Sequence, residues 1–174
     1  MEYLYHRVPK NMVGTTLYPL NVLKETQPEI YNEHIKKYED RKHLLTTEIP
    51  PLRCLWNDVL HLTAVAPASL KANLAKAGIE LPPTAWFKIP VSLIQGGNSI
   101  AFTYRRDKDV IPNFKEYEPF DPARMEIYRI VPEETIEYYK QKRADGARPL
   151  LFHLVPHILY KGTIDTEVLE IVYS

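Results

Sequence analysis

A histidine and an arginine stand side by side near the N-terminus, at the end of a short β-prone run. The run covers residues 3–8 and contains His6 and Arg7, and a turn with Gly14 follows it. An imidazole and a guanidinium next to flexible backbone offer hydrogen-bond donors and a positive charge. The pattern favours an anionic or nucleotide-like ligand. The alternative for His6 is a structural histidine satisfied by hydrogen bonds.

Three further polar groups lie in or beside apolar, strand-like segments. His61 and Thr63 belong to an apolar run at residues 58–63, Arg105 opens a small basic cluster, and Glu126 lies in the segment 125–131. Each has a structural alternative: a core imidazole for His61, and a solvated edge residue for Arg105 and Glu126. The sequence alone leaves these alternatives open.

The charge balance and length limit the class of protein. Lys and Arg together number 22, as do Asp and Glu, so no global field draws the chain toward nucleic acid or an anionic membrane. The 174 residues suit one domain spanning 1–174 with a core of its own. No apolar run approaches the length of a membrane span, and we expect no membrane association.

The single cysteine, Cys54, cannot form an intrachain disulfide. We therefore expect a reducing compartment and a cytoplasmic protein. Its apolar neighbours favour a buried, inert thiol over a nucleophile.

The sequence offers little for metal chemistry. His153 and His157 are four residues apart, but Pro156 lies between them, so the segment is extended and does not hold them as a helix would. A metal site also needs more ligands than are visible nearby. We expect no metal, and no phosphate loop, nucleophile elbow or zinc-protease motif occurs in the sequence.

Hydrophobic periodicity and helix-start signals predict strands and helices in a mixed order. The expected strands cover residues 3–8, 58–63, 86–89, 100–104, 125–131, 150–155 and 168–173, with a further short one at 157–160. The expected helices cover residues 28–43, 69–77 and 132–143. This irregular order predicts an α+β fold with about three helices.

The order of these elements resembles the ADP-ribosyltransferase fold of toxin-type transferases and RNA 2′-phosphotransferases. The resemblance covers residues 3–136 and rests on four segments: residues 3–8 with the following glycine, residues 58–78, residues 86–94 and residues 126–136. It implies a split, mainly antiparallel mixed β-sheet that grips NAD, which is consumed as a substrate. The family often has Tyr or Ser on its second strand, where this chain has His61 and Thr63.

The resemblance also implies roles for individual residues. His6 and Glu126 are expected to be catalytic, with the Glu126 carboxylate stabilising the oxocarbenium character that develops on the ribose as the nicotinamide bond breaks. The residues expected to bind NAD are Arg7, Tyr18, His61, Thr63 and Arg105. The acceptor of the ADP-ribose stays open among proteins, nucleic acids and small molecules.

The sequence also supports a second hypothesis, which belongs to another class of function. The chain has 15 prolines and 12 tyrosines, and residues 107–124 form an expected long loop with three of the prolines. Tyrosine-rich and proline-rich loops are typical of protein-recognition surfaces. The alternative prediction is therefore a non-enzymatic protein-binding module.

Overall fold

The computed structural model describes residues 1–94, 96–104 and 116–174. Its β-structure consists mainly of two antiparallel sheets, one of three strands in the order β1-β6-β11 and one of four in the order β5-β9-β7-β8. Two smaller pairs, β2 with β10 and β3 with β4, lie outside them. The strands are β1 Tyr3–Arg7, β2 Thr16–Leu17, β3 Glu48–Ile49, β4 Cys54–Leu55, β5 Leu60–Leu62, β6 Ala85–Pro90, β7 Ser99–Phe102, β8 Tyr117–Pro119, β9 His157–Tyr160, β10 Ile164–Asp165 and β11 Glu170–Tyr173.

A single bridge joins the two main sheets into one split sheet. The backbones of Tyr5 on β1 and Thr63 just after β5 exchange two hydrogen bonds, of 2.7 and 3.0 Å. Continued in antiparallel register, the pairing would set Arg7 opposite His61. Within the described residues the ladder stops at the bridge, so β1 and β5 part at that point.

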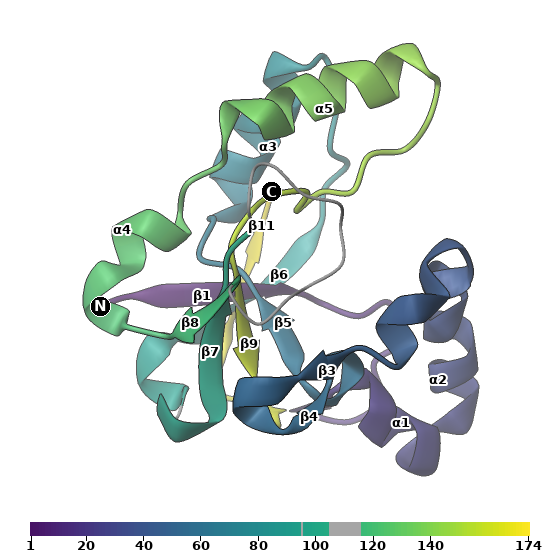
Figure 1. Ribbon diagram of the computed structural model, residues 1–174, viewed down its shortest axis with the longest axis vertical. Coiled ribbons are helices and arrows are strands. Elements are labelled where there is room, and N and C mark those ends of the chain that lie inside the picture. The colour runs from purple at the N-terminus through teal and green to yellow at the C-terminus, as the bar shows by residue number, and fades with distance from the viewer. Residues whose placement is uncertain (95, 105–115) are drawn as a thin grey trace.

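Helices cover both faces of the split sheet. The α-helices are α1 Leu20–Thr26, α2 Pro28–Ile35, α3 Pro67–Lys76, α4 Met125–Tyr128 and α5 Glu133–Ala144. Short 3-10 helices connect them: η1 Lys36–Leu45, η2 Pro50–Leu52, η3 Trp56–Asp58, η4 Val91–Leu93, η5 Gly96–Asn98 and η7 Pro122–Arg124. In Figure 1, α3 and α5 lie together at one end of the molecule, while α1 and α2 lie at the opposite end. No helix within the described residues is long and apolar enough to cross a membrane.

Local sequence signals explain where several helices begin and end. α2 and α3 each begin with a proline at the first helical position, where a missing N–H costs nothing. α3 ends before Gly78, whose φ of +70° is in the left-handed region that glycine tolerates best. α5 has two glutamates in its first turn and basic residues in its last, an arrangement that complements the helix dipole.

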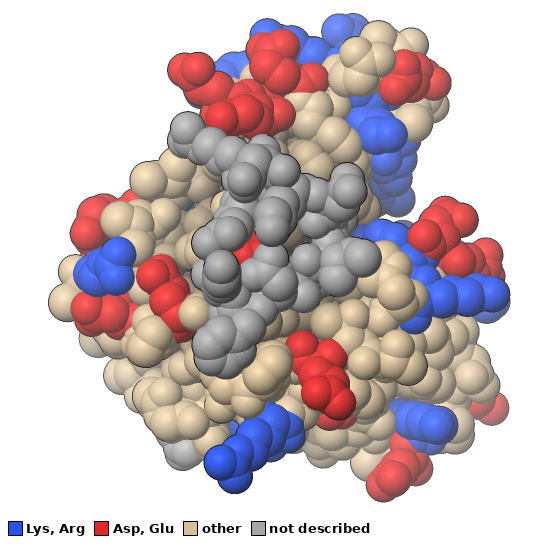
Figure 2. Space-filling model, in the orientation of Figure 1, with Lys and Arg blue, Asp and Glu red and all other residues tan. Residues whose placement is uncertain are grey.

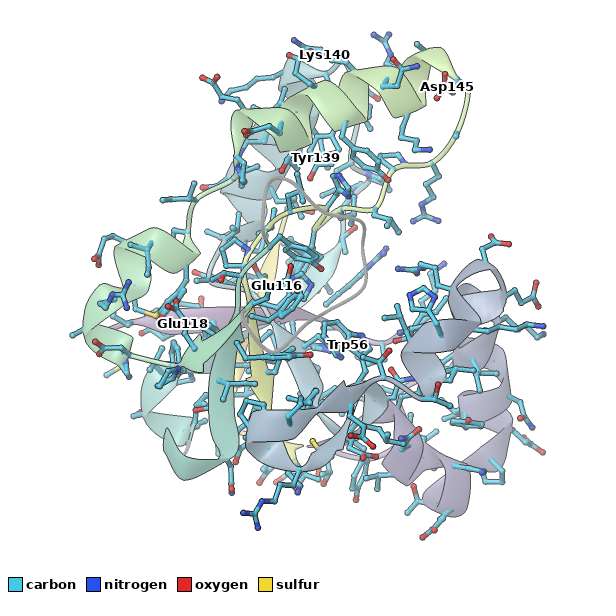
Figure 3. The ribbon with its side chains drawn as sticks, in the orientation of Figure 1. Trp56, Glu116, Glu118, Tyr139, Lys140 and Asp145 are labelled. Atoms are coloured by element: carbon cyan, nitrogen blue, oxygen red, sulfur yellow. The ribbon has the colours of Figure 1, made fainter. Side chains whose placement is uncertain are left out.

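The core has three parts. One part lies on one face of the split sheet, and the other two cover different halves of the opposite face. Leu4, Leu62 and Ile89 pack with Met125 and Tyr128 of α4 on one side of the sheet. Tyr139 of α5 lies in a second cluster together with α3, and Figure 3 shows its ring on the side of α5 that faces the sheet. The third cluster, around Trp56 and Phe102, joins the second sheet to η1 and η3.

The predicted α+β class is confirmed, but two of the predicted strands are wrong. Residues 125–128 form α4 because Met125 and Tyr128, three positions apart, are both buried against the sheet. Residues 151–154 form a turn, with Leu154 at a φ of +57°, between Pro149 and Pro156. The 157–160 segment, by contrast, is the central strand β9.

Candidate functional site

A pocket opens where β1 and β5 part. Its volume is about 840 Å³, within the range of about 300–1,000 Å³ that is usual for sites of small-molecule ligands. The ends of β1 and β5 form its floor, α1, α2 and η1 form one wall, and the segment 148–153 forms the other. Figure 2 shows a notch between these two sides of the molecule, with Lys and Arg side chains on both of its edges.

The second wall is held in place by α5. The hydroxyl of Thr135 donates to the carbonyl of His153 (2.8 Å), and that of Tyr139 donates to the carbonyl of Leu151. The Tyr138 and His153 rings stack with centroids 3.9 Å apart. The turn at 151–154 thus presents its side chains to the pocket from a fixed support.

Three histidines reach the pocket from three different strands: His6 from β1, His61 from β5 and His157 from β9. His61 pairs with Leu159 in the β5–β9 register, so His157 is its diagonal neighbour on the same face. Their ring centroids are 6.1 Å apart. The β9 strand therefore brings a third imidazole beside the two that the sequence singled out.

Backbone carbonyls fix the tautomer of each of these histidines. His6 Nδ1 lies 2.7 Å from the carbonyl of Arg7, His61 Nε2 lies 2.8 Å from that of Trp56, and His157 Nδ1 lies 2.8 Å from that of Val155. A carbonyl oxygen only accepts, so the nitrogen facing it must carry the proton. In the neutral ring the other nitrogen is then an acceptor.

The three imidazoles are neutral near pH 7. Burial lowers the pKa of His6 to about 4 and that of His61 to about 3, and it lowers the pKa of His157 as well. His157 also acts on His61, and the positive charge of Lys37 further disfavours protonation of both His6 and His61. The site is thus arranged to accept hydrogen bonds through uncharged rings, with fixed positive charge nearby.

The pocket is basic although the chain as a whole carries no net charge. Among the described lining residues Glu33 is the one carboxylate, and the Asn11 side chain donates to it. The described cations that line the pocket are Arg7, Lys10, Lys37, Arg41 and Arg148. This excess of positive charge favours an anionic ligand.

Aromatic rings line the pocket beside the histidines. Trp56 lies against His61 with ring centroids 4.7 Å apart. The ring centroids of Tyr104 and Phe152 lie 5.9 and 5.8 Å from that of His157. Figure 3 places Trp56 between the sheet and the side of the molecule formed by α1 and α2. Such surfaces suit planar groups such as a nucleobase or a pyridine ring.

The structure brings most of the predicted binding residues to this pocket. Arg7, Tyr18, His61 and Thr63 line it together with His6. Thr63 is 4% exposed and also forms the bridge between the sheets, and its hydroxyl accepts from the Val65 amide. Thr63 therefore positions the floor of the pocket.

Arg105 lies outside the described residues, as does the first half of the predicted 107–124 loop, residues 107–115. The described end of that loop contains β8 and η7.

The structure does not bring Glu126 to His6. Glu126 lies exposed in the first turn of α4 and is not among the residues that line the pocket. An ion pair between Arg129 and Glu2 ties the end of α4 to the N-terminus, and Figure 1 shows α4 beside the start of β1. His6 stands at the other end of that strand. The strand expected to carry Glu126 is a helix, which is why the carboxylate is displaced.

Sequence reasoning missed His157, Lys37 and Arg41 as pocket residues. In the sequence, His157 stands out only through its spacing from His153, a pattern that bears on metal binding. In the part of the chain that the structure describes, no group of three or more His, Cys, Asp or Glu side chains is arranged to hold a metal ion. Five of the six histidines of the chain line the pocket, although they are spread over segments far apart in the sequence.

Comparison of the chain with protein-family models, with curated proteins and with solved structures finds no match.

Proposed function

We propose that the chain binds NAD in the pocket at the split of the sheet and transfers its ADP-ribose to an acceptor. The observation that carries this proposal is that, among the described residues, three neutral histidines and five cations line one pocket together with a single carboxylate. The resemblance of residues 3–8, 58–78 and 86–94 to the ADP-ribosyltransferase fold supports it, and so does the division of the sheet at the pocket. The fourth segment, residues 126–136, begins in α4 and gives no support.

Each part of the pocket suits one part of a dinucleotide. Guanidinium and ammonium groups neutralise the pyrophosphate, and aromatic rings cover the planar bases. The acceptor nitrogens of His6 and His61 receive hydrogen bonds from ribose hydroxyls.

The displacement of Glu126 changes the expected chemistry. As the bond to nicotinamide breaks, positive charge develops on the ribose, and groups with negative potential stabilise it. Of the described lining residues, the unprotonated nitrogens of His6, His61 and His157 and the Glu33 carboxylate have that character. We assign this electrostatic role to them, and a cytoplasmic location fits the single cysteine.

A second candidate is a protein that binds the nucleotide without turning it over. The position of Glu126, exposed on α4 outside the pocket, favours it. The alternative is a protein-recognition surface on the proline-rich loop 107–124. Residues 107–115 of that loop lie outside the described residues, and its described half contains β8 and η7.

Thermal-shift titration with NAD tests the proposal, followed by measurement of nicotinamide release. Binding to the native state alone raises the melting temperature by mass action, and the rise should grow with NAD concentration. Release of nicotinamide separates the transferase from the binding protein. No shift with millimolar NAD would contradict both.

A further inference from the structure

One wall of the pocket contains a buried amide with an unused donor. Asn57 on η3 is 2% exposed and lines the pocket. Its side-chain oxygen accepts a 2.8 Å hydrogen bond from the Tyr38 hydroxyl on η1. Its side-chain nitrogen, which carries two N–H groups, is buried and has no partner within the described residues. A buried donor without a partner is destabilising unless a ligand or water accepts from it.

Two cations accompany this amide. Lys37 Nζ lies 5.1 Å from the centroid of the Tyr38 ring, and the Arg41 guanidinium lies 5.7 Å from it. Both line the pocket, and no carboxylate pairs with either of them in the described part of the chain. The charge of Arg41 also acts on the hydroxyl of Tyr104, which lines the same pocket. We call Lys37, Tyr38, Arg41 and Asn57 the Tyr38 wall.

We propose that the Tyr38 wall is a subsite for a phosphoryl group. Asn57 Nδ2 donates to one phosphoryl oxygen, and Lys37 and Arg41 balance the charge of the others. The inference rests on the proposed function for the identity of the whole ligand. It goes further by assigning the phosphate to residues that are far in the sequence from the His6–Arg7 pair.

The composition of the wall favours phosphate over a neutral carbonyl. A carbonyl oxygen would satisfy Asn57 but would leave two unpaired cations facing it. A phosphoryl group offers several anionic oxygens, which amide, ammonium and guanidinium donors can share. Lys37 also acts electrostatically on His6 and His61, so this subsite borders the histidines. The phosphate is either the pyrophosphate of NAD or a phosphate on the acceptor.

Two variants test the subsite. Asn57→Asp keeps the oxygen that accepts from Tyr38 and replaces the two N–H donors with a second anionic oxygen. Arg41→Gln removes one charge on the partly exposed η1 and keeps the fold testable if the first variant does not fold. The matched controls are Asn73→Asp on α3, where the side chain is partly exposed, and Arg124→Gln on η7, since neither residue lines the pocket.

Calorimetric titrations with inorganic pyrophosphate, NAD and nicotinamide riboside give the readout. We expect Asn57→Asp and Arg41→Gln to weaken pyrophosphate binding by about tenfold or more, and the controls to match the wild type. If NAD affinity falls equally while nicotinamide riboside affinity does not, the subsite holds the pyrophosphate of NAD. If NAD affinity is unchanged, it holds the phosphate of an acceptor.

The inference and the proposed function fail separately. Pyrophosphate and NAD affinities that stay at the wild-type value in both variants would overturn the subsite, even if NAD binds. Binding of pyrophosphate that depends on Asn57, in a protein that ignores NAD, would support the subsite and contradict the proposed function.

Discussion

Acidification should destabilise this fold through His6 and His61. Both rings are held neutral, with the pKa lowered to about 4 for His6 and about 3 for His61. In the unfolded chain a histidine has a pKa of about 6.5, so between pH 6.5 and pH 4 the unfolded state binds protons that the native state does not. The contribution of these two histidines to the free energy of unfolding is therefore fully present above pH 6.5, and it is lost as the pH falls.

The size of the effect follows from the same shifts. Between pH 6.5 and pH 5 the contribution of each histidine to the free energy of unfolding falls by about 2 kcal/mol, because one pKa unit corresponds to about 1.4 kcal/mol. The two together give a loss of about 4 kcal/mol between pH 7 and pH 5. His157 contributes in the same direction because its pKa is also lowered.

Urea denaturation at pH 7 and pH 5 measures this loss, and a double variant isolates its source. In His6→Asn and His61→Gln an amide N–H replaces the ring N–H that donates to the Arg7 or Trp56 carbonyl, and neither new side chain titrates. The double variant should retain about 4 kcal/mol more of its pH 7 stability at pH 5 than the wild type does. Replacement of the exposed His43 by Gln is the control. An equal loss in the wild type and the double variant would refute the assignment.

Three other outcomes are expected. Glu126→Gln should leave both NAD affinity and nicotinamide release unchanged, because that carboxylate is exposed on α4 outside the pocket. A large decrease in the rate of nicotinamide release would show that Glu126 does belong to the site. Leu62→Ala should cost about 2–5 kcal/mol in urea denaturation, because the side chain is fully buried between the sheet and α4, and a cost below about 1 kcal/mol would contradict that packing. Gly78→Ala should cost about 1 kcal/mol, because an alanine would be strained at a φ of +70°, whereas Gly96→Ala, with open space around it, should cost less; equal costs would rule out the strain.

Short-range signals explain the parts of the fold that the sequence predicted well. The α3 helix has its proline start and its glycine stop, and the β1 and β6 strands have apolar residues at the positions that are buried. The strand predicted at residues 125–131 is wrong because the apolar residues of this segment fit both the two-residue period of a strand and the 3.6-residue period of a helix. Met125 and Ile127 suggest a strand, whereas Met125 and Tyr128 suit a helix, and only the tertiary contact with the sheet decides between them.

The site was partly predictable for a related reason. His6 and His61 stand in recognisable strands, and both line the pocket. His157 joins them only through the β5–β9 register, a pairing between segments about 100 residues apart that no local pattern encodes. The Tyr38 wall depends on a contact between η1 and η3. Nothing in the sequence of either segment indicates that the Asn57 amide is left without a hydrogen-bond partner.

The imidazole resonances of the histidines show whether NAD occupies the pocket that these side chains line. Two-dimensional NMR spectra of the imidazole groups, recorded while NAD is added, report on His6, His61, His157 and the exposed His43 in one experiment. We expect the first three resonances to move together and to saturate with a single affinity, while that of His43 stays in place. Saturating NAD that leaves the resonances of His6, His61 and His157 unchanged would contradict the assignment of the pocket.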